Sequence, residues 1–190
     1  MTVTSPPLVD AEATRAWGAV LGRMLRSGDL VILTGGLGAG KTTLTQGIAQ
    51  GLGVRGPITS PTFVIARVHP SLAAGPVLVH VDAYRLSGLD ELDDLDLDAD
   101  LDRAVTVVEW GRGVADDLSE DALEVVLEGE STRRATVAAR GERWTSPEAR
   151  TALAALAAVD NGRDDPGPNR AISRFLPERD VDNDGEGGRT

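Results

Sequence analysis

Apolar residues recur along the first third of the chain with the two spacings that distinguish helices from strands. Residues 10–26 carry them at helical intervals, and the segment 27–29, Ser-Gly-Asp, is typical of a helix end. The β-branched run 30–33 predicts a buried strand, and residues 44–52 return to helical spacing. The pattern therefore predicts helix, strand and helix, with a glycine-rich stretch between the last two.

The rest of the pattern indicates mainly strands. Segments 63–68 and 77–82 both have strand character, and the connection between them is too short for a helical crossover, which predicts an antiparallel hairpin. A second hairpin is predicted for 123–127 and 135–139. The other expected elements are a helical or turn-like segment at 86–101, a strand at 105–110 and an alanine-rich helix at 147–159.

Composition changes near residue 160. We expect residues 1–159 to form one domain and residues 160–190 to be a disordered tail, because this acidic segment is rich in Gly and Pro and has few apolar side chains to offset the loss of chain entropy. Residues 1–9 are expected to be loose as well.

The chain has 190 residues, a net charge of -11 and no cysteine. A protein this acidic is poorly suited to bind the phosphate backbone of a nucleic acid, and we therefore expect no contact with DNA. Any role in an RNA pathway would depend on a protein partner. The missing cysteines exclude disulfides, thiolate metal sites and cysteine nucleophiles. No apolar run has the length of a membrane span and no signal pattern is present, which predicts a cytoplasmic protein without a membrane partner.

The glycine-rich stretch matches G-x-x-x-x-G-K-[ST], the phosphate-binding pattern of a P-loop, and it lies between a predicted strand and a predicted helix as that motif requires. Glycines leave room for a phosphate, which the loop amides and the positive end of the helix would bind. Lys41 supplies a cation for the β and γ phosphates, and the Thr42 hydroxyl is placed to ligate Mg²⁺. The predicted nucleotide-binding residues here are Gly36, Leu37, Gly38, Ala39, Gly40, Lys41, Thr42 and Thr43.

Two acids stand at predicted strand ends, the edge at which open α/β sheets bind ligands. Asp82 follows VLVHV and Glu109 follows VTVV. One could hold Mg²⁺ while the other positions an attacking water, and the sequence leaves these catalytic and metal-binding roles open between them. The structural alternatives are an exposed strand-end acid for Glu109 and, for Asp82, a cap or an ion pair with Arg85.

Other polar and aromatic residues are predicted close to this edge. The loop 59–63, Thr-Ser-Pro-Thr-Phe, has the position of a switch loop, in which Ser60 or Thr62 would offer a hydroxyl to the metal and the γ-phosphate. A hydroxyl-rich turn is the alternative. Trp110 could stack on a base or belong to the core, and His80 is expected to point into the packing beside Asp82.

These features together predict an α/β fold of the P-loop NTPase type, with three layers around a mixed, largely parallel central sheet. No strand is followed by the N-K-x-D motif of guanine recognition, which favours ATP over GTP. The leading hypothesis is a Mg²⁺-dependent ATP hydrolase. The alternatives are a small-molecule kinase, disfavoured by the lack of an arginine-rich lid segment, and a nucleotide-dependent interaction module without hydrolysis.

Four motifs in order, GGLGAGKTTLTQGIAQGLG, TSPTF, HVDAYRL and VVEWG, resemble the TsaE (YjeE) family of bacterial ATPases in the threonylcarbamoyladenosine pathway for position 37 of tRNA. The likeness covers roughly residues 8–158. It implies a weak ATPase that uses ATP and Mg²⁺ and assembles with the proteins TsaD and TsaB. Hydrolysis would support turnover of that complex rather than the transfer itself, and tRNA would be met only through the complex.

The resemblance also implies roles for particular residues. Thr42 and Glu109 would be metal-associated, Asp82 would be catalytic or metal-linked, and Trp110 would lie against the nucleotide.

At three other positions the resemblance is less direct. Asp10 and Arg133 correspond to nucleotide contacts from the two ends of the fold. The chain departs from the family at Gly36, where the loop usually carries Asp. The phosphate pattern accepts any residue there, but a carboxylate that could contact a partner or the metal shell is missing. The tail after residue 160 has no counterpart in the family.

Overall fold

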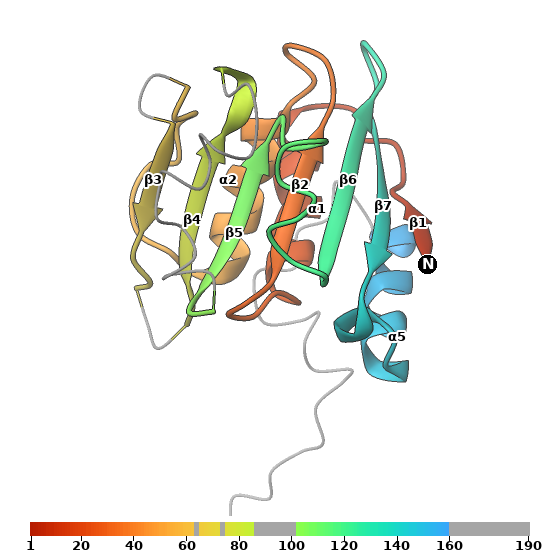
Figure 1. Cartoon of the computed structure of the whole chain (residues 1–190). Coiled ribbons are helices and arrows are strands. Elements are labelled where there is room, and N and C mark those ends of the chain that lie inside the picture. Colours follow the sequence, from red (N-terminus) through yellow and green to blue (C-terminus); the bar gives the residue numbers. More distant parts are fainter. Residues whose placement is uncertain (63–64, 73–74, 86–101, 160–190) are drawn as a thin grey trace, which may run out of the picture.

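A seven-stranded sheet runs through the computed structural model, which describes residues 1–62, 65–72, 75–85 and 102–159 (Figure 1). The predictions for segment 86–101 and for the tail 160–190 lie outside the described residues. The strands, in the spatial order β1-β7-β6-β2-β5-β4-β3, are β1 Thr2–Thr4, β2 Leu30–Thr34, β3 Ala66–His69, β4 Val77–Asp82, β5 Ala104–Glu109, β6 Ala122–Glu128 and β7 Arg134–Arg140.

The sheet is mixed, with its parallel strands at the centre. Strands β6, β2, β5 and β4 pair in parallel, and the outer strands β3, β7 and β1 are added antiparallel. Both predicted hairpins form, as β3–β4 and β6–β7. Several predicted strand limits differ from the observed ones. Residues 63 and 64 lie outside the described residues, β3 begins at Ala66, and β5 ends at Glu109, one residue before Trp110.

The helices are α1 Ala11–Gly22, α2 Lys41–Leu52 and α5 Pro147–Ala155, with short 3₁₀ turns η1 Ala83–Arg85, η2 Glu142–Trp144 and η3 Leu156–Ala158. The first helix is shorter than the predicted span 10–26, and the last changes to a 3₁₀ turn after Ala155. Within the described ranges, no helix is both long and apolar enough to cross a membrane.

The three helices pack against one face of the sheet (Figure 1). Trp17 of α1 is fully buried there, and its indole Nε1 donates to the Leu156 carbonyl of η3 over 3.0 Å. The opposite face is covered by η1 and by the irregular segment 111–118, through Ala83 and Ala115. The predicted α/β class with a mixed, largely parallel sheet is confirmed.

The expectation that residues 1–9 are loose was wrong. Strand β1 pairs with β7, with Val3 opposite Val137, and Leu8 is fully buried. Leu8 also exchanges two backbone hydrogen bonds with Arg133, of 2.8 and 3.0 Å. Apolar burial and pairing with a distant strand therefore order a segment that is too short to show a clear pattern of its own.

Helices α1 and α2 approach so closely that only glycines fit at their contact. A Cβ atom on Gly47 would lie 2.2 Å from the Arg15 carbonyl oxygen, and one on Gly22 would lie 2.3 Å from that of Ile48. Gly18 and Gly51 lie at the same contact and likewise leave no room for a side chain. Because α2 begins at the end of the glycine-rich loop, this contact fixes the position of the loop against the sheet.

Gly47→Ala is therefore expected to destabilise the protein. Alanine exceeds glycine by about 1 kcal/mol in helix propensity, but forcing a methyl group against a backbone carbonyl costs about 1–3 kcal/mol, so the free energy of unfolding should fall. Urea unfolding measures the change, and Gln50→Ala, on the exposed side of the same helix, is the control, expected within about 0.5 kcal/mol of wild type. A Gly47→Ala protein as stable as wild type would contradict the close contact.

Candidate active site

The glycine-rich loop joins β2 to α2 and presents an open helix start. Among the three α-helices described, α1 and α5 are capped by the side chains of Asp10 and Ser146, which accept from backbone N–H groups. The N-cap residue of α2 is instead Gly40, which has a φ of 102° and provides no side-chain cap. Its first N–H groups and its positive dipole end are thus available to an anion, as phosphate binding requires.

Lys41 is held over this loop, and only 5% of the residue is exposed. Its Nζ donates to the carbonyl oxygens of Gly35, at 2.8 Å, and Gly36, at 3.0 Å. The ammonium also lies 3.5 Å from the centroid of the Trp110 ring, a cation–π contact. Burial lowers the pKa of Lys41, while the carboxylates of Glu109 and Asp82 act in the opposite direction.

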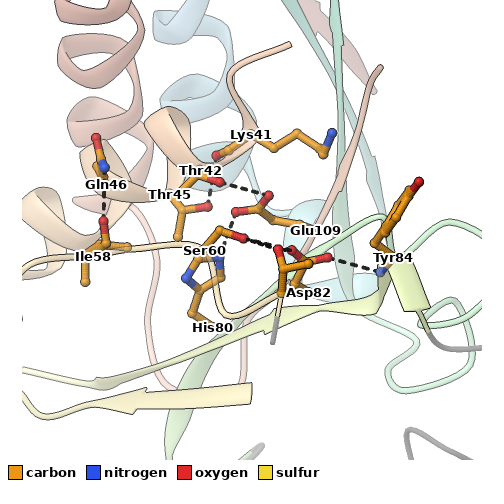
Figure 2. A network of polar contacts seen from close by, with 11 residues as sticks. Lys41, Thr42, Thr45, Gln46, Ile58, Ser60, His80, Asp82, Tyr84 and Glu109 are labelled. Carbon is orange, nitrogen blue, oxygen red and sulfur yellow. Dashed lines mark hydrogen bonds and ion pairs between the residues drawn. The ribbon is translucent and has the colours of Figure 1, made fainter. Parts of the chain in front are cut away.

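The sheet register brings the two predicted acids together. In the parallel pair β4–β5, Asp82 lies directly opposite Glu109, and in the pair β2–β5, Glu109 lies opposite Leu33. Both acids are buried, with 4% of Asp82 and 3% of Glu109 exposed. The alternative of an exposed strand-end acid is therefore excluded for Glu109, and the acids stand beside the start of α2 (Figure 2).

Both oxygens of Glu109 are engaged by neighbouring elements. Thr42 of α2 donates its hydroxyl to Oε2 over 3.1 Å, and Nε2 of His80 on β4 lies 2.8 Å from Oε1 (Figure 2). This carboxylate thus links the first turn of α2 to two strands of the sheet.

Asp82 is surrounded by hydroxyl groups of the predicted switch-like loop. Its Oδ2 accepts from Ser60 over 2.8 Å and from Thr62, and its Oδ1 accepts from the backbone N–H of Tyr84 over 3.1 Å. The two hydroxyl oxygens are also 2.6 Å from each other. The carboxylate caps the η1 turn, as one structural alternative supposed, and it also holds the loop against the sheet.

Trp110 begins the segment after β5 in a conformation that favours glycine, with φ of 61°. This conformation turns the chain at the sheet edge and leaves the indole beside Lys41 instead of in the core. Its ring also contacts Tyr84, with centroids 5.1 Å apart. Tyr84, which the sequence did not single out, is therefore part of the aromatic group next to the glycine-rich loop.

A pocket of about 850 Å³ opens beside the loop. It is lined by residues 34–39 of the loop, by Trp110 and Arg112, and by residues 126–130 and Arg133. Arg133 donates from Nη2 to the Gly38 carbonyl over 3.0 Å, so the predicted contact residue does lie at the loop.

For two residues the structure adds a contact that the sequence did not predict. The Asp10 carboxylate accepts from the N–H of Ala13 at the start of α1, so the structure gives it the part of a helix cap, and its contact with nucleotide stays a prediction. His80 is buried, as predicted, and its ring also contacts Glu109. The alternation of β4 contains the signal for this contact, since His80 and Asp82 are two residues apart and share one face of the sheet.

The residues present fit a nucleotide phosphate and a Mg²⁺ ion. The uncapped start of α2 and the ammonium of Lys41 suit the anion. In the part of the chain that the structure describes, no three His, Cys, Asp or Glu side chains form a metal cluster. Mg²⁺ commonly binds through one or two carboxylates together with substrate phosphates and water, and Glu109, Asp82 and the Thr42 hydroxyl offer such a set.

Comparison with known proteins points to one family. The sequence model described as threonylcarbamoyl adenosine biosynthesis protein TsaE matches residues 8–136. A protein of Streptomyces coelicolor, named tRNA threonylcarbamoyladenosine biosynthesis protein TsaE, is 57% identical over 141 residues, which are 70% of this chain and 95% of that protein. The protein of the same name from Mycobacterium tuberculosis is 53% identical over 134 residues, 67% of this chain and 78% of that protein.

A solved structure agrees with these sequence matches. The crystal structure of YdiB from Bacillus subtilis superposes with a TM-score of 0.60 at 31% sequence identity, and it covers 76% of this chain and 89% of the other. The structural similarity therefore extends over about three quarters of the chain.

The buried lysine predicts a pH dependence of stability. Between the lowered pKa in the folded state and the ordinary value of 10.5, the unfolded chain binds more protons than the folded chain, so the contribution of Lys41 to the free energy of unfolding rises with pH. Relative to Lys41→Met, the wild type should gain stability as the pH rises through the range just below 10.5. Urea unfolding of both proteins across this range tests it, and a difference independent of pH would contradict the buried, desolvated ammonium.

Proposed function

The chain belongs to the TsaE family, which acts in tRNA threonylcarbamoyladenosine biosynthesis, and we propose that it serves there as a Mg²⁺-dependent P-loop ATPase. The observation that carries this proposal is the convergence of three parts: the uncapped start of α2 with Lys41, the Thr42–Glu109 pair, and Asp82 with its two hydroxyl donors. Phosphate binding, metal binding and water positioning each find suitable groups within this one edge of the sheet.

The phosphates of ATP would be bound by the amides of residues 36–43 and by Lys41. In binding them, the Lys41 ammonium would exchange the carbonyls of Gly35 and Gly36 for phosphate oxygens, which carry more negative charge. Thr42 and Glu109 would hold Mg²⁺, directly or through water. When bound, Mg²⁺ supplies positive charge that neutralises the charge developing on the transferred phosphoryl group.

Asp82 is the better candidate to orient the attacking water. Its carboxylate is fixed by Ser60, Thr62 and the Tyr84 amide, so it can accept a hydrogen bond from a water without moving. It lies opposite Glu109 in the register, which leaves it close enough to share the metal shell as well. The loop 59–62 would then respond to the phosphate through the hydroxyls that now contact Asp82.

The base and ribose fit the pocket beside the loop. Trp110 and Arg133 line this pocket, and the indole is held in place by its contacts with Lys41 and Tyr84. ATP is the proposed nucleotide because the chain has no guanine-recognition motif on a strand. Asp10 would reach the nucleotide only from the start of α1.

We place the protein in the cytoplasm, as an accessory subunit of a TsaD–TsaB complex that modifies position 37 of tRNA. The surface around the site supports a protein partner, because Leu37 at the loop tip is 91% exposed and Tyr84 is 60% exposed. We propose that these two exposed side chains take part in the contact with the partner protein. Contact with tRNA would occur only through the complex, in keeping with the net charge of -11.

Two substitutions separate binding from hydrolysis. Lys41→Ala should abolish ATP binding, because it removes the cation at the phosphates. Glu109→Ala should retain ATP binding but lower the hydrolysis rate about 10–100-fold or more, since the carboxylate proposed to hold Mg²⁺ at the transferred phosphate is lost. Calorimetry measures binding and free phosphate release measures hydrolysis.

The same assay decides between the alternatives. Normal turnover in both variants would refute the assignment of the site. Release of free phosphate without an added acceptor would argue against a small-molecule kinase, whereas ATP binding without turnover, alone or with the partner proteins, would favour a non-hydrolysing interaction module.

Assembly is testable with the partner proteins themselves. The chain is expected to co-purify with a TsaD–TsaB pair when ATP is present and to release phosphate faster in that mixture than alone. Lys41→Ala is the control, since it should not respond to ATP. Equal recovery of wild type with and without ATP would show that nucleotide does not govern the association.

A further inference from the structure

His80 is a buried polar side chain that the proposed ATPase chemistry does not use. It lies on β4 with none of its surface exposed, and its ring Nε2 is 2.8 Å from Oε1 of Glu109. The other ring nitrogen, Nδ1, has no hydrogen-bond partner among the described residues. Among the described residues, the buried imidazole therefore forms one hydrogen bond, to a carboxylate oxygen of Glu109. This indicates that the bond has a specific role.

From this geometry we infer that His80 is a positioning residue for Glu109. A carboxylate oxygen accepts hydrogen bonds, so we take Nε2 of His80 as the donor in this contact. The bond anchors Oε1, and the rotation of the carboxylate about its terminal bond is thereby restricted. Oε2, which accepts from Thr42, is left directed toward the first turn of α2.

The position of each group explains why the anchor is needed. Glu109 is the last residue of β5, and the chain turns sharply after it at Trp110, with φ of 61°. The Trp110 N–H donates to the Leu33 carbonyl of β2 over 2.9 Å, so the backbone is held there, and the freedom that remains is that of the Glu109 side chain. His80 lies on the neighbouring strand, two residues before the position opposite Glu109, so the rigid β4–β5 pair carries both partners.

Without the imidazole, one oxygen of a carboxylate that is only 3% exposed would lack its donor. The carboxylate would then turn toward another donor, and its orientation to Thr42 would change. Residues that orient ligands of a metal in this way typically change metal affinity or activity 10–100-fold when replaced.

The inference rests on the proposed function, and one set of variants tests it. The amide nitrogen of Gln reaches the place of the imidazole Nε2, whereas that of Asn reaches only the place of Nδ1. His80→Gln should therefore keep hydrolysis near wild type, and His80→Asn and His80→Leu should lower kcat about tenfold or more. ATP affinity measured without Mg²⁺ should stay unchanged in all three variants. The Mg²⁺ concentration for half-maximal hydrolysis should rise in the His80→Asn and His80→Leu proteins.

His69 provides the matched control. It is the other histidine of the chain, 5% exposed, on β3, which is separated from β5 by β4. His69→Asn is expected to retain the wild-type kcat and Mg²⁺ dependence. A second control is the Glu109→Gln background, in which His80→Asn should cause no further loss, because the carboxylate it positions is already gone.

The outcomes separate this inference from the proposed function. If the wild type hydrolyses ATP but His80→Gln and His80→Asn have equal kcat and Mg²⁺ dependence, the positioning role is wrong. This comparison does not depend on whether His80→Leu folds. If His80→Asn lowers kcat to the same extent in the Glu109→Gln background, His80 acts on something else. If the wild type shows no hydrolysis, alone or with TsaD and TsaB, the proposed function fails first, and the Mg²⁺ affinity of the ATP-bound variants still tests His80.

Discussion

A carboxylate in the interior must have its oxygens satisfied, and Glu109 meets this constraint by joining three elements of the structure. Thr42 holds one oxygen from the first turn of α2, and His80 holds the other from β4. The helix, the loop before it and the two strands are thus linked where the chemistry is proposed. The close contact between α1 and α2 at their glycines adds to this linkage, because it holds α2 against α1.

Local pattern predicted the elements and their order because each one reflects contacts between residues close in sequence. The strand before the loop, the helix after it and both hairpins were found from apolar spacing and short connections. The strand-end acids were also found, since each follows its own apolar run. Their proximity required only that β4 and β5 be parallel neighbours, which the register confirms.

The missed features depend on residues far apart in the chain. The pairing of β1 with β7 orders Val3 and Leu8, but the three residues Thr2–Thr4 are too few to show the alternating pattern that predicts a strand. The contact of His80 with Glu109 spans 29 positions, and the role of the α1 and α2 glycines depends on how two helices cross. The position of Trp110 was also not predicted. Its apolar character suggested that it continues the strand, but its positive φ ends the strand before it.

The placement of the three tryptophans gives the protein a built-in optical signal. Trp17 is fully buried and Trp144 is 3% exposed, both in the apolar cluster beneath the helices. Trp110 alone contacts a charged group of the glycine-rich loop, the Lys41 ammonium. Because indole emission responds to nearby charge and solvent, a protein in which Trp17 and Trp144 are replaced by phenylalanine would report the state of the loop by fluorescence, without a label.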